Sequence, residues 1–257
     1  MQKNPGEKVN MKIPLTGYGL RELILFPTLL LAAGIVSWFA WSAGRPWCQI
    51  AAAILGLGVL AFFRDPPRQV LNDQDVLLAP ADGIITDICE VEEPEFIKGS
   101  ARRIGIFLSV LDVHINRTPC DGVVEYIRAH PGKCYNALRT RLASEKNKAN
   151  CVGLHCPDHP AGMVMVKQIT GVIARRIVCR CKPGDMLSAG ERFGMIKFGS
   201  RTELFLPEDG RAQIMVKKGD KVRAGTTILV HYGSTKSQNG PLTTNPEVKT
   251  KVMQNRG

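Results

Sequence analysis

Three side chains from distant parts of this chain have the types needed to activate a serine hydroxyl. Ser200 and His114 each stand beside an apolar, strand-like stretch, and Asp82 lies in a Pro-Ala-Asp-Gly turn. Serine, histidine and aspartate serve as nucleophile, base and base-orienting group in many sites that activate a hydroxyl. We therefore take Ser200 as the candidate nucleophile, His114 as its candidate base and Asp82 as the candidate orienting group.

The Gly199-Ser200 pair interrupts a stretch that otherwise predicts strands. Apolar residues precede and follow the pair, whereas glycine loses much backbone entropy in a strand and packs no side chain there. A β-bulge, which glycine tolerates well, would explain the pair. Alternatively, Ser200 attacks the carbonyl of Gly199, which no side chain shields. The pair alone leaves both explanations open, and the upstream histidine and aspartate favour the second.

Several short segments between about residues 60 and 235 occur in an order that is typical of a known family. They are Phe63-Arg-Asp-Pro-Pro-Arg68, Ala79-Pro-Ala-Asp-Gly83, Asp112-Val-His-Ile-Asn-Arg117, Tyr135-Asn-Ala137, Ser144-Glu-Lys-Asn147 and Phe198-Gly-Ser-Arg201. Together they make the chain resemble the phosphatidylserine decarboxylase family, and within it the short, membrane-attached form that includes archaetidylserine decarboxylase-like proteins. The chain departs from larger members in one place, because His-x-x-His is replaced by His114-Ile-Asn-Arg117.

The resemblance implies a proenzyme that splits its own backbone. His114, oriented by Asp82, would take the proton of Ser200, and the serine oxygen would attack the Gly199 carbonyl. Nearby donors would hold the resulting oxyanion. Elimination and hydrolysis would then convert Ser200 into a pyruvoyl group, which is the cofactor that the resemblance implies.

The second stage implied by the resemblance is decarboxylation of a lipid. Fragments 1–199 and 200–257 would remain together as a heterodimer, and the pyruvoyl group would form a Schiff base with the amine of an anionic serine phospholipid. Phosphatidylserine, or a close serine lipid, would become an ethanolamine lipid, because the imine draws electrons from the breaking carbon–carboxylate bond. Arg117 is a candidate for binding the substrate, and His155 is the reserve candidate for the base or for substrate binding.

Two uncharged runs near the N-terminus predict a transmembrane helical hairpin. Residues 23–42 are long enough to cross the hydrocarbon of a bilayer, and residues 47–63 are at the short end of that range. Basic residues flank both ends, so the positive-inside rule places the termini and the catalytic domain on the cytoplasmic side of the cell membrane. The alternative is a buried hairpin in a soluble domain, since the second run is short and contains glycine.

From Val70 onward the pattern changes to short strands and turns. Pro-x-Asp-Gly occurs at residues 80–83, 119–122 and 207–210, and Gly-Asp-x-x-x-Ala-Gly begins at Gly184 and again at Gly219. Asp-Gly supplies the backbone conformation that tight turns need. The fold class predicted is mostly β, resembling the barrel-sandwich module of lipoyl and biotinyl domains, with little helix beyond residues 139–146. The predicted divisions are a basic segment 1–21, the hairpin 22–63, a catalytic β domain 64–234 and a polar, disordered tail 235–257.

The net charge and the cysteine pattern limit which membranes, nucleic acids or metals the chain could bind. The chain has 34 Lys and Arg against 23 Asp and Glu, a net charge of +11, which attracts an anionic membrane or a nucleic acid. Aromatic residues make up only 6% of the chain and do not alternate with basic clusters, so we expect no nucleic-acid partner. The eight cysteines contain no Cys-x-x-Cys pair and match no common zinc spacing. We therefore expect reduced thiols and no metal.

A different class of function is compatible with the same turns and strands. A membrane-anchored barrel-sandwich module that binds or adapts other proteins would need no catalysis, and Gly199-Ser200 would then be a bulge. The enzyme yields two fragments and the binding module stays whole, so the two hypotheses differ in a directly measurable property. Because none of the three candidate residues lies in residues 1–63, we expect a chain without them to split normally.

Overall fold

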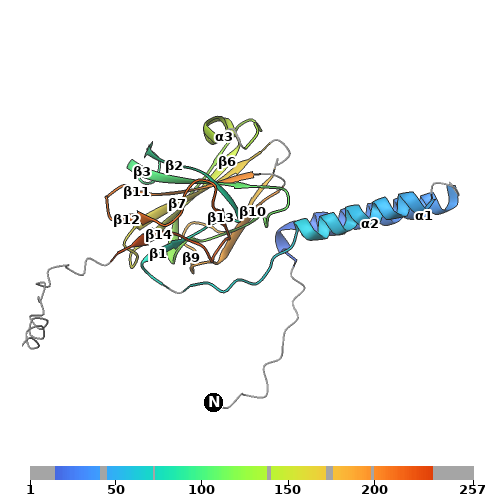
Figure 1. The fold of residues 1–257 in the computed structure, drawn as a ribbon, viewed down its shortest axis with the longest axis horizontal. Helices are drawn as coiled ribbons and strands as arrows, with labels where there is room; N and C mark the ends of the chain where they lie inside the picture. The colour runs from blue at the N-terminus through green and yellow to red at the C-terminus, as the bar shows by residue number, and fades with distance from the viewer. Residues whose placement is uncertain are drawn as a thin grey trace, which may run out of the picture.

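A helical arm and a β domain make up the described part of the chain (Figure 1). The structure is a computed structural model, and it describes residues 15–40, 45–71, 73–137, 140–171, 176–197 and 200–233. Gly199 and the tail 235–257, which we expect to be disordered, lie outside the described residues, as does most of the basic segment 1–21.

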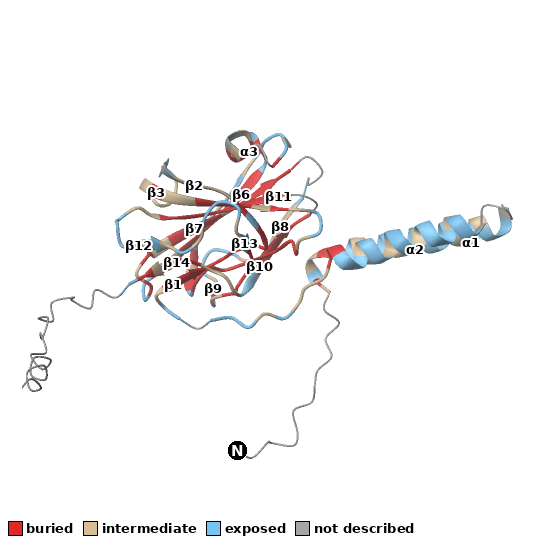
Figure 2. Ribbon diagram, viewed as in Figure 1, coloured by how far each residue is buried: buried red, intermediate tan, exposed pale blue. Residues whose placement is uncertain are grey.

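The arm consists of two helices that lie side by side, α1 (Leu20–Ala40) and α2 (Arg45–Phe62), preceded by the short 3-10 helix Gly17–Gly19 (Figure 1). Most residues of both helices are exposed (Figure 2). Within the described ranges, Gly17–Phe39 is the segment long and apolar enough to cross a membrane, and Pro46–Phe62 is shorter. The 18-residue apolar window of the first segment has no buried residue, so a hairpin buried in a soluble domain is wrong. That both helices cross the membrane remains a prediction.

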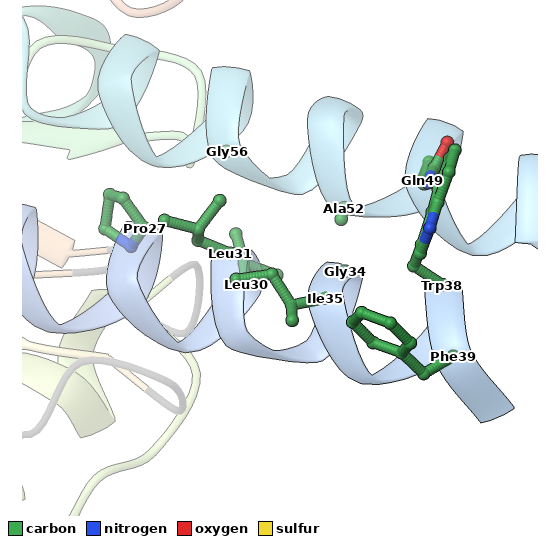
Figure 3. A pocket seen from close by; sticks show the side chains of 10 residues that line it. All are labelled: Pro27, Leu30, Leu31, Gly34, Ile35, Trp38, Phe39, Gln49, Ala52 and Gly56. Atoms are coloured by element: carbon green, nitrogen blue, oxygen red, sulfur yellow. The ribbon is translucent and has the colours of Figure 1, made fainter.

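Small residues leave a groove between the two helices. It has a volume of about 530 Å³, and Gly34, Ala52 and Gly56 line it together with large apolar side chains (Figure 3). Gln49 is the polar side chain among its lining residues. An apolar groove of this kind is suited to hydrocarbon rather than water, in keeping with a membrane environment for the arm.

The β domain confirms the prediction of a mostly β fold. Its helix α3 (Thr140–Lys146) matches the short helix predicted at residues 139–146. The strands are β1 (Val76–Leu78), β2 (Gly83–Glu93), β3 (Gly99–Leu108), β4 (Ile115–Arg117), β5 (Gly122–His130), β6 (Ala149–Cys156), β7 (Gly162–Thr170), β8 (Ile177–Cys179), β9 (Met186–Leu187), β10 (Arg192–Ile196), β11 (Ser200–Pro207), β12 (Ala212–Ile214), β13 (Lys221–Val222) and β14 (Ile228–Tyr232).

The largest sheet curls until its two edges approach each other. Its strand order is β13-β2-β3-β11-β7-β6-β5-β9, and two smaller sheets have the orders β1-β14-β12 and β4-β10-β8. A Cβ added to Gly225, beyond edge strand β13, would lie 3.4 Å from the Cα of Gly190, beyond edge strand β9. Both glycines have positive φ, 71° and 70°, a conformation that other residues rarely adopt. The edge strands β13 and β9 approach each other in this way without pairing, and the loops beyond them cover the gap.

The two sequence repeats meet in equivalent clasps. In one clasp the Ala224 N–H donates to the Asp82 carboxylate at 2.8 Å, and in the other the Ala189 N–H donates to the Asp121 carboxylate at 2.6 Å. Each pairs the aspartate of a Pro-x-Asp-Gly turn with the alanine of a Gly-Asp-x-x-x-Ala-Gly segment. The clasp at Asp82 therefore has a structural counterpart at Asp121, in the other half of the fold.

Strands that follow Ser200 are woven into sheets formed by strands that precede it. β11 lies between β3 and β7, β13 pairs with β2, and β14 lies between β1 and β12. The main core, which includes Leu77, Ile106, Val166, Leu204 and Val230, is built from both parts. A break in the backbone before Ser200 would thus leave both pieces held in one core.

Candidate active site

The three candidate residues converge on one end of strand β3. Ser200 begins β11 and pairs with Leu108, the last residue of β3. Asp82 lies two residues before Ile84, which pairs with Phe107 on the other side of β3. His114 follows β3 after a tight turn. The sheet register thus brings the three chain segments to the same end of β3.

Ser200 is fully buried, and its hydroxyl is unusual because it lacks a hydrogen-bond partner among the described residues. An unsatisfied buried hydroxyl costs about 1–3 kcal/mol, so such groups call for an explanation. One explanation is that the Ser200 oxygen must be free to move and attack its own backbone, because a strong hydrogen-bond partner would hold it in place.

His114 is buried in the form that a base requires. Its Nδ1 lies 2.9 Å from the Asp112 backbone carbonyl. A carbonyl can only accept, so Nδ1 carries the proton and the imidazole lone pair is on Nε2. Burial lowers the pKa of His114 to about 4, the bond and charge of Asp112 oppose this shift, and Arg64 adds to it. The imidazole is therefore neutral near pH 7 and able to accept a proton.

The root of the helical arm forms one wall around this histidine. The ring of Phe62, the last residue of α2, lies 4.6 Å from the His114 ring between centroids, and Phe63 packs edge-on against Phe62 at 5.1 Å. Phe62 and Phe63 form a buried cluster with Val113 and other apolar residues. Loss of residues 1–63 would expose His114. The packing therefore argues against the expectation that a chain without residues 1–63 splits normally.

Asp82 has two well-defined partners. Its Oδ2 accepts from Arg68 Nη2 at 2.7 Å, and its Oδ1 accepts from the Ala224 N–H. Burial raises the pKa of Asp82, the Ala224 bond and Arg68 oppose that effect, and the Asp112 charge adds to it. Since the Asp112 carbonyl occupies Nδ1 of His114, the orienting role of Asp82 remains a prediction.

Arg117 fastens the segment that follows the helical arm. Its Nη1 donates to the Gly190 carbonyl at 2.9 Å, and its Nη2 lies 3.1 Å from Asp65 Oδ1 and 3.3 Å from the Pro66 carbonyl. Burial lowers the pKa of Arg117, the charge of Arg192 adds to that effect, and Asp65 opposes it. These partners give Arg117 a structural role, and its predicted contact with substrate remains untested.

His155 lies at the opposite end of the sheet. Ser200 pairs with Thr170 on β7, whereas His155 pairs with Met163 on the same strand. Seven positions separate Thr170 from Met163, which corresponds to about 23 Å. A hydrogen bond between His155 and Ser200 is out of reach, so we do not retain His155 as a reserve base.

A chain of buried amides underlies the site, and the sequence did not single it out. Asn116 Nδ2 donates to Thr202 Oγ1 at 3.0 Å, Gln168 Nε2 donates to Asn116 Oδ1 at 2.8 Å, and Asn150 Nδ2 donates to Gln168 Oε1 at 3.1 Å. Asn116 and Thr202 each lie two residues beyond a candidate, His114 and Ser200. This direct contact holds strand β4 against β11.

Two of the family-like segments meet beside Ser200. Asn147 Nδ2 donates to the carbonyls of Tyr135 at 2.8 Å and Thr170 at 2.6 Å, and Asn147 Oδ1 accepts from the Tyr135 N–H at 2.7 Å. Thr170 is the β7 partner of Ser200. Asn147 therefore ties the segment at Tyr135 to the strand next to the candidate nucleophile.

Within the described residues, three possible metal ligands come together. Ligand atoms of Glu95, His130 and Cys151 all lie within 4.8 Å of one another. Glu95 Oε2 already accepts from Tyr126 and lies 3.1 Å from His130 Nε2. The expectation of no metal remains a prediction.

A buried serine and a buried, neutral histidine from segments that meet at one end of β3, with the flanking strands interwoven, are compatible with an enzyme that processes its own chain. A family model described as phosphatidylserine decarboxylase matches residues 55–230. The chain belongs to the phosphatidylserine decarboxylase family.

Curated relatives agree along most of their length. A phosphatidylserine decarboxylase proenzyme from Rhodopirellula baltica is 43% identical over 221 residues, which cover 86% of this chain and 89% of the relative. A proenzyme of the same name from Carboxydothermus hydrogenoformans is 40% identical over 221 residues, covering 85% of this chain and 98% of the relative. A third, from Desulfotalea psychrophila, is 44% identical over 185 residues, covering 71% of this chain and 84% of the relative.

Proposed function

We propose that this protein is a self-processing decarboxylase that converts phosphatidylserine, or a close serine phospholipid, to the ethanolamine lipid. The observation that carries the proposal is the buried Ser200 hydroxyl, without a hydrogen-bond partner among the described residues, where the His114 and Asp82 segments converge. Membership in the family supports the same reading over that of a binding module without catalysis.

Self-processing begins with a proton transfer that His114 is prepared to accept. The Ser200 hydroxyl gives its proton to Nε2, and its oxygen attacks the preceding carbonyl carbon. The carbon–nitrogen bond then breaks, the amine takes a proton, and an ester replaces the amide. The Asp112 carbonyl stabilises the histidinium formed, because it accepts a hydrogen bond from Nδ1.

Residue 200 fits the group that the family implies. A serine is the precursor of a pyruvoyl group, and Ser200 begins a strand whose next residues are locked in place: Arg201 is fully buried and bound to Asp87 and Glu203. A pyruvoyl group there would supply an electron sink for the bond between the substrate's α-carbon and its carboxylate. The role of the surrounding chain is to hold residue 200 still and to exclude water. Interwoven strands would keep fragments 1–199 and 200–257 together as a heterodimer.

A membrane location follows from the same proposal. The substrate resides in a bilayer, and α1 supplies one segment that is long and apolar enough to enter it. Basic residues precede the first helix of the arm and follow the second in the sequence, for example Arg21, Arg64 and Arg68. This favours a cytoplasmic position for the β domain. Basic residues near the surface would attract anionic headgroups at about 1 kcal/mol each.

The decisive experiment compares Ser200→Ala with Ser100→Ala, a matched strand serine whose hydroxyl donates to Glu90. Intact-mass measurement should find two fragments for the natural chain and for Ser100→Ala, and one uncut chain for Ser200→Ala. Carbon dioxide release from phosphatidylserine vesicles should be lost only in Ser200→Ala. Carbon dioxide release by uncut Ser200→Ala would refute the proposal, and a natural chain that stays whole would favour the binding module.

A further inference from the structure

An apolar turn tip projects from the β domain at the root of the helical arm. The turn joins β3 to β4, and its tip residues Val110 and Leu111 are 48% and 82% exposed. Beneath them, the Asp112 N–H donates to the Ser109 carbonyl at 3.0 Å, and Asp112 Oδ2 accepts from the Ser109 N–H at 2.7 Å. A single exposed leucine is ordinary, but this closed turn presents two adjacent apolar side chains in a fixed place.

Arg64 ties the tip to the end of α2. Its Nη1 donates to the Ala61 carbonyl at 2.7 Å, inside the last turn of the helix, and its Nη2 donates to the Leu111 carbonyl at 2.5 Å. Arg64 lies two residues after Phe62, where α2 ends. The tip therefore lies at the level where the helical arm meets the β domain.

The length of the helices sets that level relative to a bilayer. α1 has 21 residues, about 31 Å at 1.5 Å per residue, close to the hydrocarbon thickness of about 30 Å. When α1 spans the hydrocarbon, the root of the arm lies in the interfacial layer, and Arg64 and Leu111 lie there with it. Arginine is favourable at such a position because its charge can reach lipid phosphates.

We infer that Val110 and Leu111 insert into the interfacial layer of an anionic bilayer next to the helical arm. The exposed apolar tip is bound to the end of the apolar arm by Arg64, which also supplies positive charge there. The inference rests on the proposed function for the identity of the lipid substrate. It adds a second membrane contact, made by the catalytic domain itself.

The membrane contact would act on His114 through the turn that holds it. Asp112 closes the turn through its side chain and its N–H, and its carbonyl holds Nδ1 of His114. Insertion of the tip fixes this turn against the lipid surface. It thereby holds the segment that carries His114 close to the lipid headgroups, whereas the arm alone only keeps the enzyme on the membrane.

Fluorescence tests the insertion without any use of activity. We would place a single tryptophan by Leu111→Trp in a full-length chain whose Trp38, Trp41 and Trp47 are replaced by phenylalanine. Met186→Trp is the matched control, because Met186 is an equally exposed apolar residue, 81% exposed, on the edge strand β9. In vesicles of phosphatidylserine and phosphatidylcholine with bromines near the headgroup, the tryptophan at 111 should be quenched and that at 186 should not. Equal quenching would overturn the inference.

Activity then shows what the contact does. Leu111→Asp should split normally, and the ratio of its activity on vesicles to its activity on a detergent-dispersed short-chain serine lipid should fall about tenfold. Leu111→Trp should restore the ratio, since tryptophan favours the interface, and Met186→Asp should leave it unchanged. An unchanged ratio in Leu111→Asp would overturn the inference. Loss of splitting in Ser200→Ala is a separate result, so failure of this inference and failure of the proposed function are distinguishable.

Discussion

Replacement of Phe62 by alanine should move the pH at which the chain loses its ability to split itself. Burial holds the pKa of His114 at about 4, and the Phe62 ring forms one wall of that environment at 4.6 Å. Phe62→Ala admits water to the imidazole and lets its pKa rise toward the ordinary 6.5. Phe62→Leu keeps an apolar wall and is the matched control.

The size of the effect follows from the fraction of neutral base. At pH 5.5 a histidine of pKa about 4 is about 97% neutral, and one of pKa 6.5 is about 9% neutral. The rate of splitting at that pH, relative to the rate at pH 8, should thus fall up to about tenfold in Phe62→Ala. It should remain close to the natural value in Phe62→Leu.

The assay follows pulse-labelled full-length chain, made by cell-free synthesis in detergent, after transfer to buffers between about pH 4 and about pH 8. Gel time courses give the rate at each pH. Unfolding must be monitored in parallel by near-ultraviolet circular dichroism. The unfolded histidine protonates near pH 6.5 and the folded one only near pH 4. The contribution of His114 to the free energy of unfolding is therefore fully present above pH 6.5, and it falls by about 3 kcal/mol as the pH drops to 4.

Two outcomes would refute the reasoning. A natural chain whose splitting has its midpoint near pH 6.5 would show that His114 is not held neutral by burial, or is not the base. A midpoint that is the same in Phe62→Ala and the natural chain would show that the root of the helical arm does not control the environment of the histidine.

Three further predictions concern the neighbours of the site. Asp82→Asn should slow splitting less than His114→Ala in gel time courses, because an amide oxygen can still accept the hydrogen bond from the Ala224 N–H. Asp121→Asn, the counterpart in the other half of the fold, should split normally. Equal losses in Asp82→Asn and His114→Ala would make Asp82 a direct partner of the base. Arg117→Ala breaks a buried ion pair and should lower the free energy of unfolding by about 3 kcal/mol in urea titrations, whereas full stability with lost decarboxylation would indicate a contact with substrate. A chain without residues 1–63 should split slowly by the gel assay, and normal splitting would contradict the packing of the arm against the base.

Much of the site could be predicted because its chemistry resides in residue types and short segments. Ser200, His114 and Asp82 are conspicuous in sequence, since glycine-serine is costly in a strand and Asp-Gly marks a turn. In the structure their segments lie at one end of β3. Their separate roles in catalysis remain predictions.

Other residues gave weaker signals. Asp112 stands two positions before His114 and Asn116 two positions after it, but their contacts with the Nδ1 proton and with Thr202 depend on backbone geometry. Phe62 is one apolar residue in a long apolar run, and nothing in that pattern distinguishes a side chain that faces lipid from one that faces a histidine. His155 is a reasonable reserve candidate by residue type. Only the strand register shows that its partner on β7 lies about 23 Å along the strand from the partner of Ser200.

The sequence by itself determined the family, the mostly β class, the apolar arm and the candidate nucleophile, because these depend on local pattern, composition and short motifs. Only the tertiary structure decided which groups surround that nucleophile. It showed that a backbone carbonyl holds the base, that the arm shields it, that Arg117 is committed to Asp65, and that the two repeats close one curled sheet. These contacts join residues far apart in the chain, and their partners are selected by packing and strand register, which no local pattern records.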